Sequence, residues 1–103
     1  MAISKKYLKT NPICKVTFKV ESDKVSKAKK VDLLGSFNEW KPTKDAAMKK
    51  LKDGSFTKTL DLPVSNEYQF RYIIDGKLWE NETHADKLVY NGYGTEQNSV
   101  IVL

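Results

Sequence analysis

The feature of this sequence that most limits its fold is a run of alternating apolar residues that ends in a tight turn. Between residues 68 and 74 every second side chain is apolar, and Asp75-Gly76 follows directly. A period of two is typical of a β-strand with one buried face. Asp-Gly is among the strongest signals for a two-residue hairpin turn. We therefore predict a strand over 68–74 and a hairpin that leads into Trp79.

The same kind of pattern recurs along the chain at intervals of roughly 8–12 residues. The predicted strands cover residues 15–20, 31–34, 56–62, 68–74 and 99–103, and the segment around Met48 and Leu51 should pair with 56–62 across the turn at Asp53-Gly54. Residues 21–30 are expected to form an exposed loop, and no segment has a helical apolar stripe. Short strands joined by Gly and Asp turns predict an all-β sandwich or barrel, and 103 residues suffice for a single domain.

The N-terminal residues 1–13 are predicted to be a partly ordered extension, and residues 14–103 the folded domain. The first eleven residues are polar and lysine-bearing, without the apolar stretch of a secretory signal peptide. No apolar run approaches the ~18 residues that a membrane span needs. We expect no membrane association and a cytoplasmic location.

The net charge of +5 raises the question of nucleic-acid binding. The positive charge is concentrated in residues 1–58, which hold 15 lysines and 6 acidic residues, whereas residues 59–103 hold 3 bases and 7 acids. Only Arg71 among the 18 basic residues is an arginine, so the chain has almost no side chains for bidentate recognition of bases or phosphates. Solvated lysine faces are the favoured interpretation, and no nucleic-acid partner is expected.

Catalysis and metal binding also find little support. The single histidine, His84, has no neighbouring nucleophile, and the single cysteine, Cys14, lies in a predicted strand where burial is expected. The carboxylates of the 75–86 segment (Asp75, Glu80, Glu82 and Asp86) are expected to be solvated, because a small sandwich offers no apolar cleft to raise the pKa of one of them. We predict no enzyme activity, no metal and no cofactor.

The two tryptophans are more informative. Trp40 follows a Gly-Ser-Phe-Asn turn and Trp79 follows the Asp-Gly turn, so both are expected on or beside loops. Exposed indoles can stack on the apolar face of a sugar ring while polar groups bind its hydroxyls. The residues alone leave two readings equally open, a ligand platform and a pair of tryptophans packed over the edge of the sandwich.

The order of motifs resembles the family 48 carbohydrate-binding module, also called the isoamylase N-terminal or early-set domain. The motifs are Val31-Asp32-Leu33-Leu34-Gly35-Ser36-Phe37-Asn38-Glu39-Trp40, Asp53-Gly54-Ser55-Phe56, Tyr68-Gln69-Phe70-Arg71-Tyr72-Ile73-Ile74-Asp75-Gly76, Gly94-Thr95 and Asn98-Ser99-Val100. They span about residues 14–103. The resemblance implies a single-domain, immunoglobulin-like β-sandwich that binds α-1,4-glucan such as glycogen or starch without cofactor or metal.

The resemblance also implies which residues bind the sugar. The carbohydrate-binding residues would be Trp40, Trp79, Arg71, Tyr93, Thr95 and Asn98. The chain departs from the family pattern at Glu96-Gln97, which adds one residue before Asn98, and in the segment after Trp79. Some members of the family have little sugar affinity. The alternative is therefore a regulatory or docking module that acts in trans on a separate glycogen- or starch-active enzyme.

Overall fold

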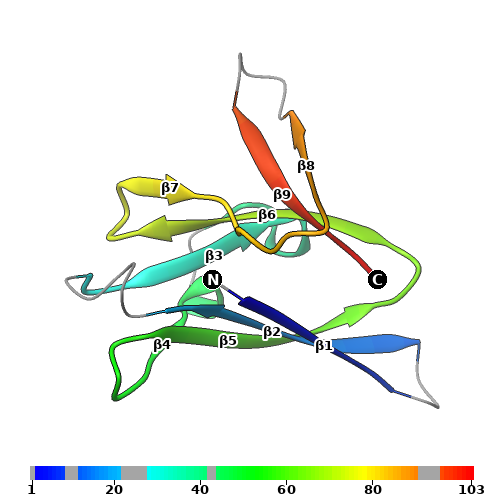
Figure 1. The fold of residues 1–103 in the computed structure, drawn as a ribbon, viewed down its shortest axis with the longest axis horizontal. Helices are drawn as coiled ribbons and strands as arrows, with labels where there is room; N and C mark the ends of the chain where they lie inside the picture. The colour runs from blue at the N-terminus through cyan, green and yellow to red at the C-terminus, as the bar shows by residue number, and fades with distance from the viewer. Residues whose placement is uncertain (1, 9–11, 22–27, 42–43, 91–95) are drawn as a thin grey trace.

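Two antiparallel β-sheets lie face to face (Figure 1). The computed structural model describes residues 2–8, 12–21, 28–41, 44–90 and 96–103. The first sheet contains β1 (Ala2–Tyr7), β2 (Ile13–Val20), β5 (Phe56–Pro63) and β4 (Lys49–Lys50) in that order, and the second contains β3 (Val31–Gly35), β6 (Glu67–Ile74), β9 (Gln97–Val102) and β8 (Lys87–Tyr90), with β7 (Leu78–Glu80) paired to β6. The helical segments within these ranges are two 3-10 turns, η1 (Ser36–Asn38) and η2 (Lys44–Ala46). The prediction of a single-domain, all-β, immunoglobulin-like sandwich is confirmed.

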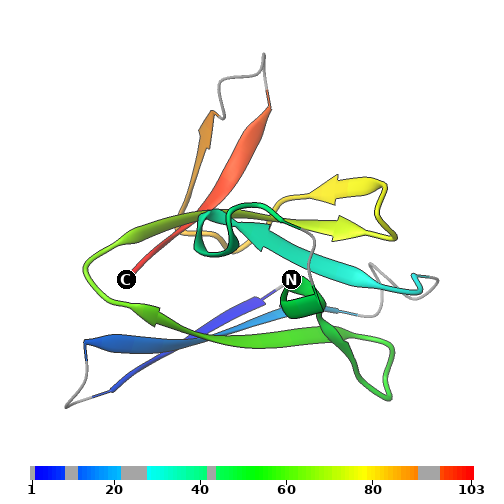
Figure 2. The same ribbon diagram turned by 180° about the vertical axis from the view of Figure 1, so that it is seen from behind.

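Strand β6 is the centre of the second sheet. One of its edges pairs with β3, and its other edge is divided between two strands. Residues 67–70 of β6 pair with β9, and residues 72–74 pair with β7. Figures 1 and 2 show β7 alongside one end of β6, while the β8–β9 pair extends away from β6 in another direction. The face of β6 that points away from the first sheet therefore lies where three strands meet.

The core lies between the sheets and is filled from alternate positions of the strands. Val16, Phe18 and Val20 project inward from β2, and Phe70 and Tyr72 project inward from β6. The rings of Phe18 and Phe70 meet edge to face with centroids 5.2 Å apart, a favourable aromatic arrangement. Cys14 is fully buried in the same cluster, as predicted. The apolar positions of the alternating pattern in β2 and β6 are the ones that point into this core.

The predicted strands are confirmed, whereas β1 and β8 were not predicted. Strand β1 pairs with β2 over six residues within the segment predicted as an N-terminal extension, but only Ile3 packs partly against the core. In β8, Leu88 and Tyr90 are largely exposed. Both are edge strands with little buried apolar surface, so an amphipathic pattern is absent from their sequences.

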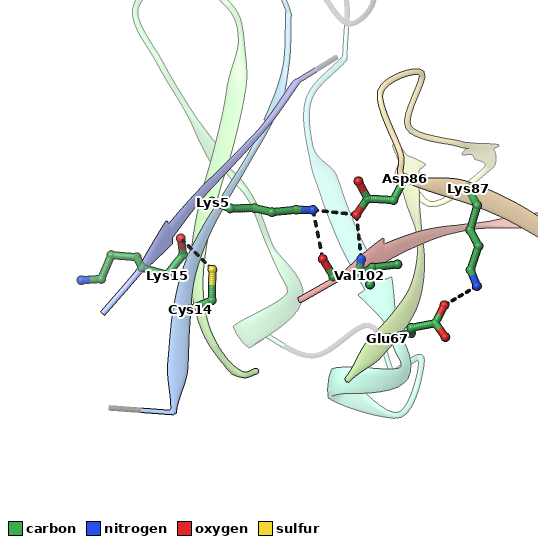
Figure 3. Close-up of polar contacts among 7 residues, drawn as sticks. All are labelled: Lys5, Cys14, Lys15, Glu67, Asp86, Lys87 and Val102. Carbon is green, nitrogen blue, oxygen red and sulfur yellow. Dashed lines mark hydrogen bonds and ion pairs between the residues drawn. The ribbon is translucent and has the colours of Figure 1, made fainter. Parts of the chain in front are cut away.

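An ion pair joins the two sheets at one side of the sandwich (Figure 3). The Lys5 Nζ of β1 donates to the Asp86 Oδ2 at 2.6 Å and to the Val102 carbonyl at 3.1 Å, and the Val102 N–H donates to the same Asp86 oxygen at 2.7 Å. Burial acts to raise the pKa of Asp86, but the hydrogen bonds from Lys5 and Val102 and the charge of Lys5 hold that pKa below its ordinary value of 3.8. The ionised carboxylate is therefore the form that the folded state favours.

We expect Asp86→Asn to lower the free energy of unfolding at pH 7 by roughly 0.5–1 kcal/mol, the usual range for a partly exposed pair. A depressed folded-state pKa contributes stability above the unfolded pKa and loses it as the pH falls through the folded value. The deficit of the variant should therefore shrink between pH 5 and pH 3, which urea unfolding at several pH values measures. A deficit that stays constant over this range would show that ionisation of Asp86 does not contribute.

Candidate functional site

The predicted site residues that the structure describes gather on the outer face of the second sheet, which points away from the core. Alternation along β6 puts Gln69, Arg71 and Ile73 on this face, because Phe70 and Tyr72 point inward. Trp79 of β7 lies directly opposite Ile73 in the ladder. Cross-strand partners project from the same face of a sheet. Arg71 and Trp79 therefore come together although eight positions separate them in the sequence.

Trp79 is the most exposed of the predicted site residues that the structure describes. Its relative exposure is 45%, and it lies in strand β7 rather than in a loop. The Arg71 guanidinium carbon lies 5.1 Å from the centroid of the indole ring, which is a cation–π distance. The guanidinium thus lies over one face of the indole ring, and the Arg71 side chain is itself only 13% exposed.

The guanidinium itself is held by two further side chains. Arg71 Nε donates to Asn98 Oδ1 at 2.9 Å, and an Arg71 terminal nitrogen donates to Glu96 Oε2 at 3.1 Å. Asn98 Nδ2 in turn donates to Gln69 Oε1 at 3.0 Å. Asn98 is 6% exposed, so it lies behind Arg71 in the wall of the site. This chain of hydrogen bonds fixes the orientation of Arg71 and, through it, of the Trp79 ring.

Trp40 reaches the same face from a tight turn after β3. Asn38 holds this turn, because its Oδ1 accepts from the N–H groups of Gly35 (3.0 Å) and Trp40 (3.2 Å) while its Nδ2 donates to the Leu33 carbonyl (2.9 Å). Glu39 and Trp40 both have positive φ angles, 57° and 60°. This conformation is rare for a bulky residue and persists only where the surroundings enforce it.

Gly35 allows the Trp40 turn to lie close against β6. A Cβ atom at Gly35 would lie 2.5 Å from the Gln69 carbonyl oxygen and 2.8 Å from the Phe37 ring, both too short for a side chain. Two residues of the Gly-Ser-Phe-Asn turn are therefore required by the structure: Gly35 because there is no room for a side chain, and Asn38 because its side chain holds the turn. Any other residue at Gly35 would push the turn, and with it Trp40, away from the sheet.

Trp40 is only half-buried, and its covered part packs against a small cluster on the outer face. The cluster consists of Leu34, Ala46 and Ile73. Trp40 therefore packs against the cluster that contains Ile73, and Trp79 is the cross-strand partner of Ile73. The two tryptophans lie on the same face of the sheet, on either side of an apolar patch. Neither ring lies in the main core.

Strand β7 is anchored at its C-terminal end by a buried polar network that the sequence did not reveal. Asn81 Nδ2 donates to the Gln97 carbonyl at 2.9 Å, and Asn81 Oδ1 accepts from Ser99 Oγ at 2.7 Å. The next residue, Glu82, has a fully buried side chain and accepts a 2.7 Å hydrogen bond from the Tyr72 hydroxyl. The expectation that the carboxylates of this segment are solvated is therefore wrong for Glu82.

The same network perturbs Tyr72. Burial, followed by the charge of Glu82 and its hydrogen bond, raises the pKa of Tyr72 far above the ordinary value of 10, so the phenol stays protonated and acts as a donor. Ser99 Oγ accepts from the Glu82 N–H at 2.8 Å, and Glu82 Oε2 accepts from the His84 N–H at 2.8 Å. The segment after Trp79 is thus fixed to β6 and β9, three residues beyond the exposed ring.

Four of the six predicted sugar-binding residues are described by the structure. In the structure Arg71 lies against the Trp79 ring and donates a hydrogen bond to Asn98. Trp40 packs against the cluster that contains Ile73. Tyr93 and Thr95 lie outside the described residues. Sequence reasoning missed Gln69 and Glu96 as partners in the site. The alternation around Arg71 could have indicated Gln69, but contact with Glu96 depends on the pairing of β6 with β9.

The described residues form no comparable arrangement for catalysis or metal binding. His84 is exposed, with Nδ1 3.7 Å from Glu82 Oε2, and it lies in the anchored segment after β7. Among the residues that the structure describes, no three His, Cys, Asp or Glu side chains converge on a possible metal site. The same residues include no helix of sufficient length and apolarity to span a bilayer.

Comparison with known proteins gives one family. A family model described as the glycogen recognition site of AMP-activated protein kinase matches residues 19–103, which is most of the chain and includes both tryptophans. A search of curated proteins finds no match. The matched range also contains Arg71, Glu96 and Asn98, so the site lies wholly within it.

Proposed function

Because this chain belongs to the family of the glycogen recognition site of AMP-activated protein kinase, we propose that it binds α-1,4-glucan chains by stacking them on Trp79 and Trp40. The observation that carries this proposal is the half-exposed Trp79 ring, held from behind by Arg71 on a face that also contains Trp40. Glycogen, starch and maltooligosaccharides all consist of glucose units that can stack on such rings.

The physical basis is aromatic stacking on a preorganised ring. A glucose unit has an apolar C–H face, and an indole held in one orientation binds it without a further entropic cost for ordering the ring. Arg71, Asn98 and Gln69 supply that ordering through the contacts described above. Arg71 additionally offers donors to sugar hydroxyls, since only two of its N–H groups are engaged in these contacts. Tyr93 and Thr95, which lie outside the described residues, remain predicted sugar contacts.

Titration of the ¹⁵N-labelled protein with maltoheptaose tests the proposal. We expect shifts of the Trp79 and Trp40 indole signals and of the backbone amides of β6 and β7, with a dissociation constant of ~1 μM to ~1 mM, because the surface is shallow. Raising the salt concentration from 50 to 500 mM should hardly change this constant, whereas binding through lysines would weaken steeply. Glycogen should bind more tightly through avidity.

An absence of shifts at millimolar maltoheptaose would contradict this function. In that case the alternative of a docking or regulatory module for a separate glucan-active enzyme would be favoured. Shifts confined to the lysine-bearing first sheet would also contradict the proposed site, because that sheet carries neither tryptophan.

A further inference from the structure

A hollow of about 290 Å³ lies on the outer face of the second sheet, further along β6 from the tryptophans. Its lining comes from β6, β9, β8 and the turn after β3, and consists of Ser36, Glu67, Gln69, Lys87, Val89 and Val100. Strand pairing accounts for this grouping, because Val100 of β9 lies opposite Gln69 on one side and opposite Lys87 on the other. Small-molecule sites begin near ~300 Å³, so the hollow has room for a small group such as a single sugar ring.

The floor of the hollow is apolar. Val100 is on the outer face of β9, because its neighbours Ser99 and Ile101 are fully buried on the inward face. Val89 of β8 lies opposite Asn98 in the ladder and is half-buried on the same outer face. These two valines offer the hydrophobic contact that the C–H face of a sugar ring can make.

The rim of the hollow carries hydrogen-bonding groups with capacity to spare. Ser36 Oγ accepts from the Gln69 N–H at 3.2 Å, which leaves its own O–H as a donor. Gln69 Oε1 accepts from Asn98, and the Gln69 Nε2 group has no partner among the described residues. Glu67 of β6 and Lys87 of β8 form an ion pair across β9. An apolar floor with a few polar groups around it is the usual composition of a small-molecule site, and these polar groups suit sugar hydroxyls.

The hollow is continuous with the proposed glucan site. Gln69 lines the hollow and also accepts from Asn98, which in turn accepts from the Arg71 side chain that lies against Trp79. Gln69 is four positions before Ile73, the cross-strand partner of Trp79, which corresponds to about 13 Å along the strand. One surface therefore holds an exposed indole and a polar-rimmed hollow, separated by more than the width of one sugar ring.

We propose that the hollow is a second subsite of the glucan site and takes a glucose unit of the same chain that stacks on Trp79. The proposal rests on the function proposed above and adds a preference for long chains over short ones. Once a chain is stacked on the indole, its contact with the hollow is intramolecular and needs no second association from solution. A chain too short to span the two positions gains nothing from the hollow.

The experiment compares maltotriose with maltoheptaose on the isotope-labelled protein, in the natural sequence and in Val89→Gln. In the natural sequence both sugars should shift the Trp79 indole signal, whereas only maltoheptaose should shift the methyl signals of Val89 and Val100. Val89→Gln puts a longer polar side chain over the apolar floor. We expect it to weaken maltoheptaose binding by about three- to tenfold, the scale of a lost apolar contact in a shallow site, and to change maltotriose binding by less than about twofold.

Leu88→Gln is the matched control. Leu88 is adjacent on β8 and 48% exposed, but it lies opposite Ser99 and therefore on the other face of the sheet. This variant makes a similar change on the same edge strand and should leave the affinities of both sugars unchanged. Lys87→Ala is a second variant, which opens the rim without touching the floor. It should weaken maltoheptaose binding by about threefold through the loss of a charged hydrogen-bonding group.

The outcomes separate this inference from the proposed function. A maltoheptaose titration that shifts the Trp79 indole signal but leaves the Val89 methyl signals in place would overturn the inference alone. Unchanged maltoheptaose affinity in both Val89→Gln and Lys87→Ala, or an equal loss in Leu88→Gln, would do the same. If neither sugar shifts the Trp79 indole signal, the proposed function fails as well.

Discussion

Trp79→Ala is expected to weaken maltoheptaose binding by about 30-fold or more while the protein stays folded. Truncation of a tryptophan at the centre of a binding surface commonly costs about 2 kcal/mol or more, which corresponds to this factor. The ring is 45% exposed and lies on a three-residue edge strand, so little core packing is lost with it. Calorimetric titration measures the affinity, and urea unfolding measures the stability.

Leu78→Ala is the matched control for Trp79→Ala. Leu78 is 54% exposed and adjacent on β7, but alternation points it to the other face of the sheet. Its removal should leave binding within about twofold. Equal losses in both variants, or an affinity of Trp79→Ala near that of the natural sequence, would contradict the site. Trp40→Ala is a less clean test, because Trp40 also packs against Leu34, Ala46 and Ile73 and its loss should lower stability.

Glu82→Ala is expected to lower the free energy of unfolding by about 2–4 kcal/mol. The substitution removes the acceptor of the buried Tyr72 hydroxyl and of the His84 N–H and leaves a cavity. A buried donor without a partner costs about 1–3 kcal/mol, and the lost packing adds to it. Domains of this size have a total stability of only about 5–15 kcal/mol, so the variant should be markedly less stable in urea unfolding.

A double-mutant cycle separates the hydrogen bond from the packing. Tyr72→Phe removes the donor, so adding it to Glu82→Ala should cost less than it costs in the natural sequence. Glu82→Gln keeps an acceptor oxygen and should be the milder substitution. If Glu82→Ala changes the free energy of unfolding by less than ~1 kcal/mol, the buried network does not anchor the segment after Trp79.

The limits of prediction from the sequence are clearest in β6 and its partners. Alternation is a local property, so residues 68–74 identified both the strand and the side that carries Arg71. The turn chemistry of Asp75-Gly76 also predicted the hairpin that leads into Trp79, although the position of Trp79 within strand β7 came only from the structure. The buried role of Glu82 was missed, because its partner Tyr72 lies ten positions away and on the inward face. Charged residues are expected at the surface unless such a partner is known.

Edge strands were also difficult to predict from the sequence. Strand β1 contributes backbone pairing and Lys5 to the fold, but its side chains lack an apolar row, and backbone pairing leaves no trace in a sequence pattern. The site residues Gln69 and Glu96 likewise became partners of Arg71 and Asn98 only through the ladder between β6 and β9. A pairing register is set by the whole sheet and not by either strand alone.

The sequence by itself determined that this chain forms short strands around a two-sheet core and that its tryptophans follow tight turns, because alternation and turn preference act between near neighbours. Only the tertiary structure decided that Arg71 lies against Trp79, that Trp40 shares the same face of the sheet, and that Glu96 pairs with Arg71. These relations join residues that the folded sheet brings within a few ångströms. Their energies depend on distance and burial, which no local pattern of residues specifies.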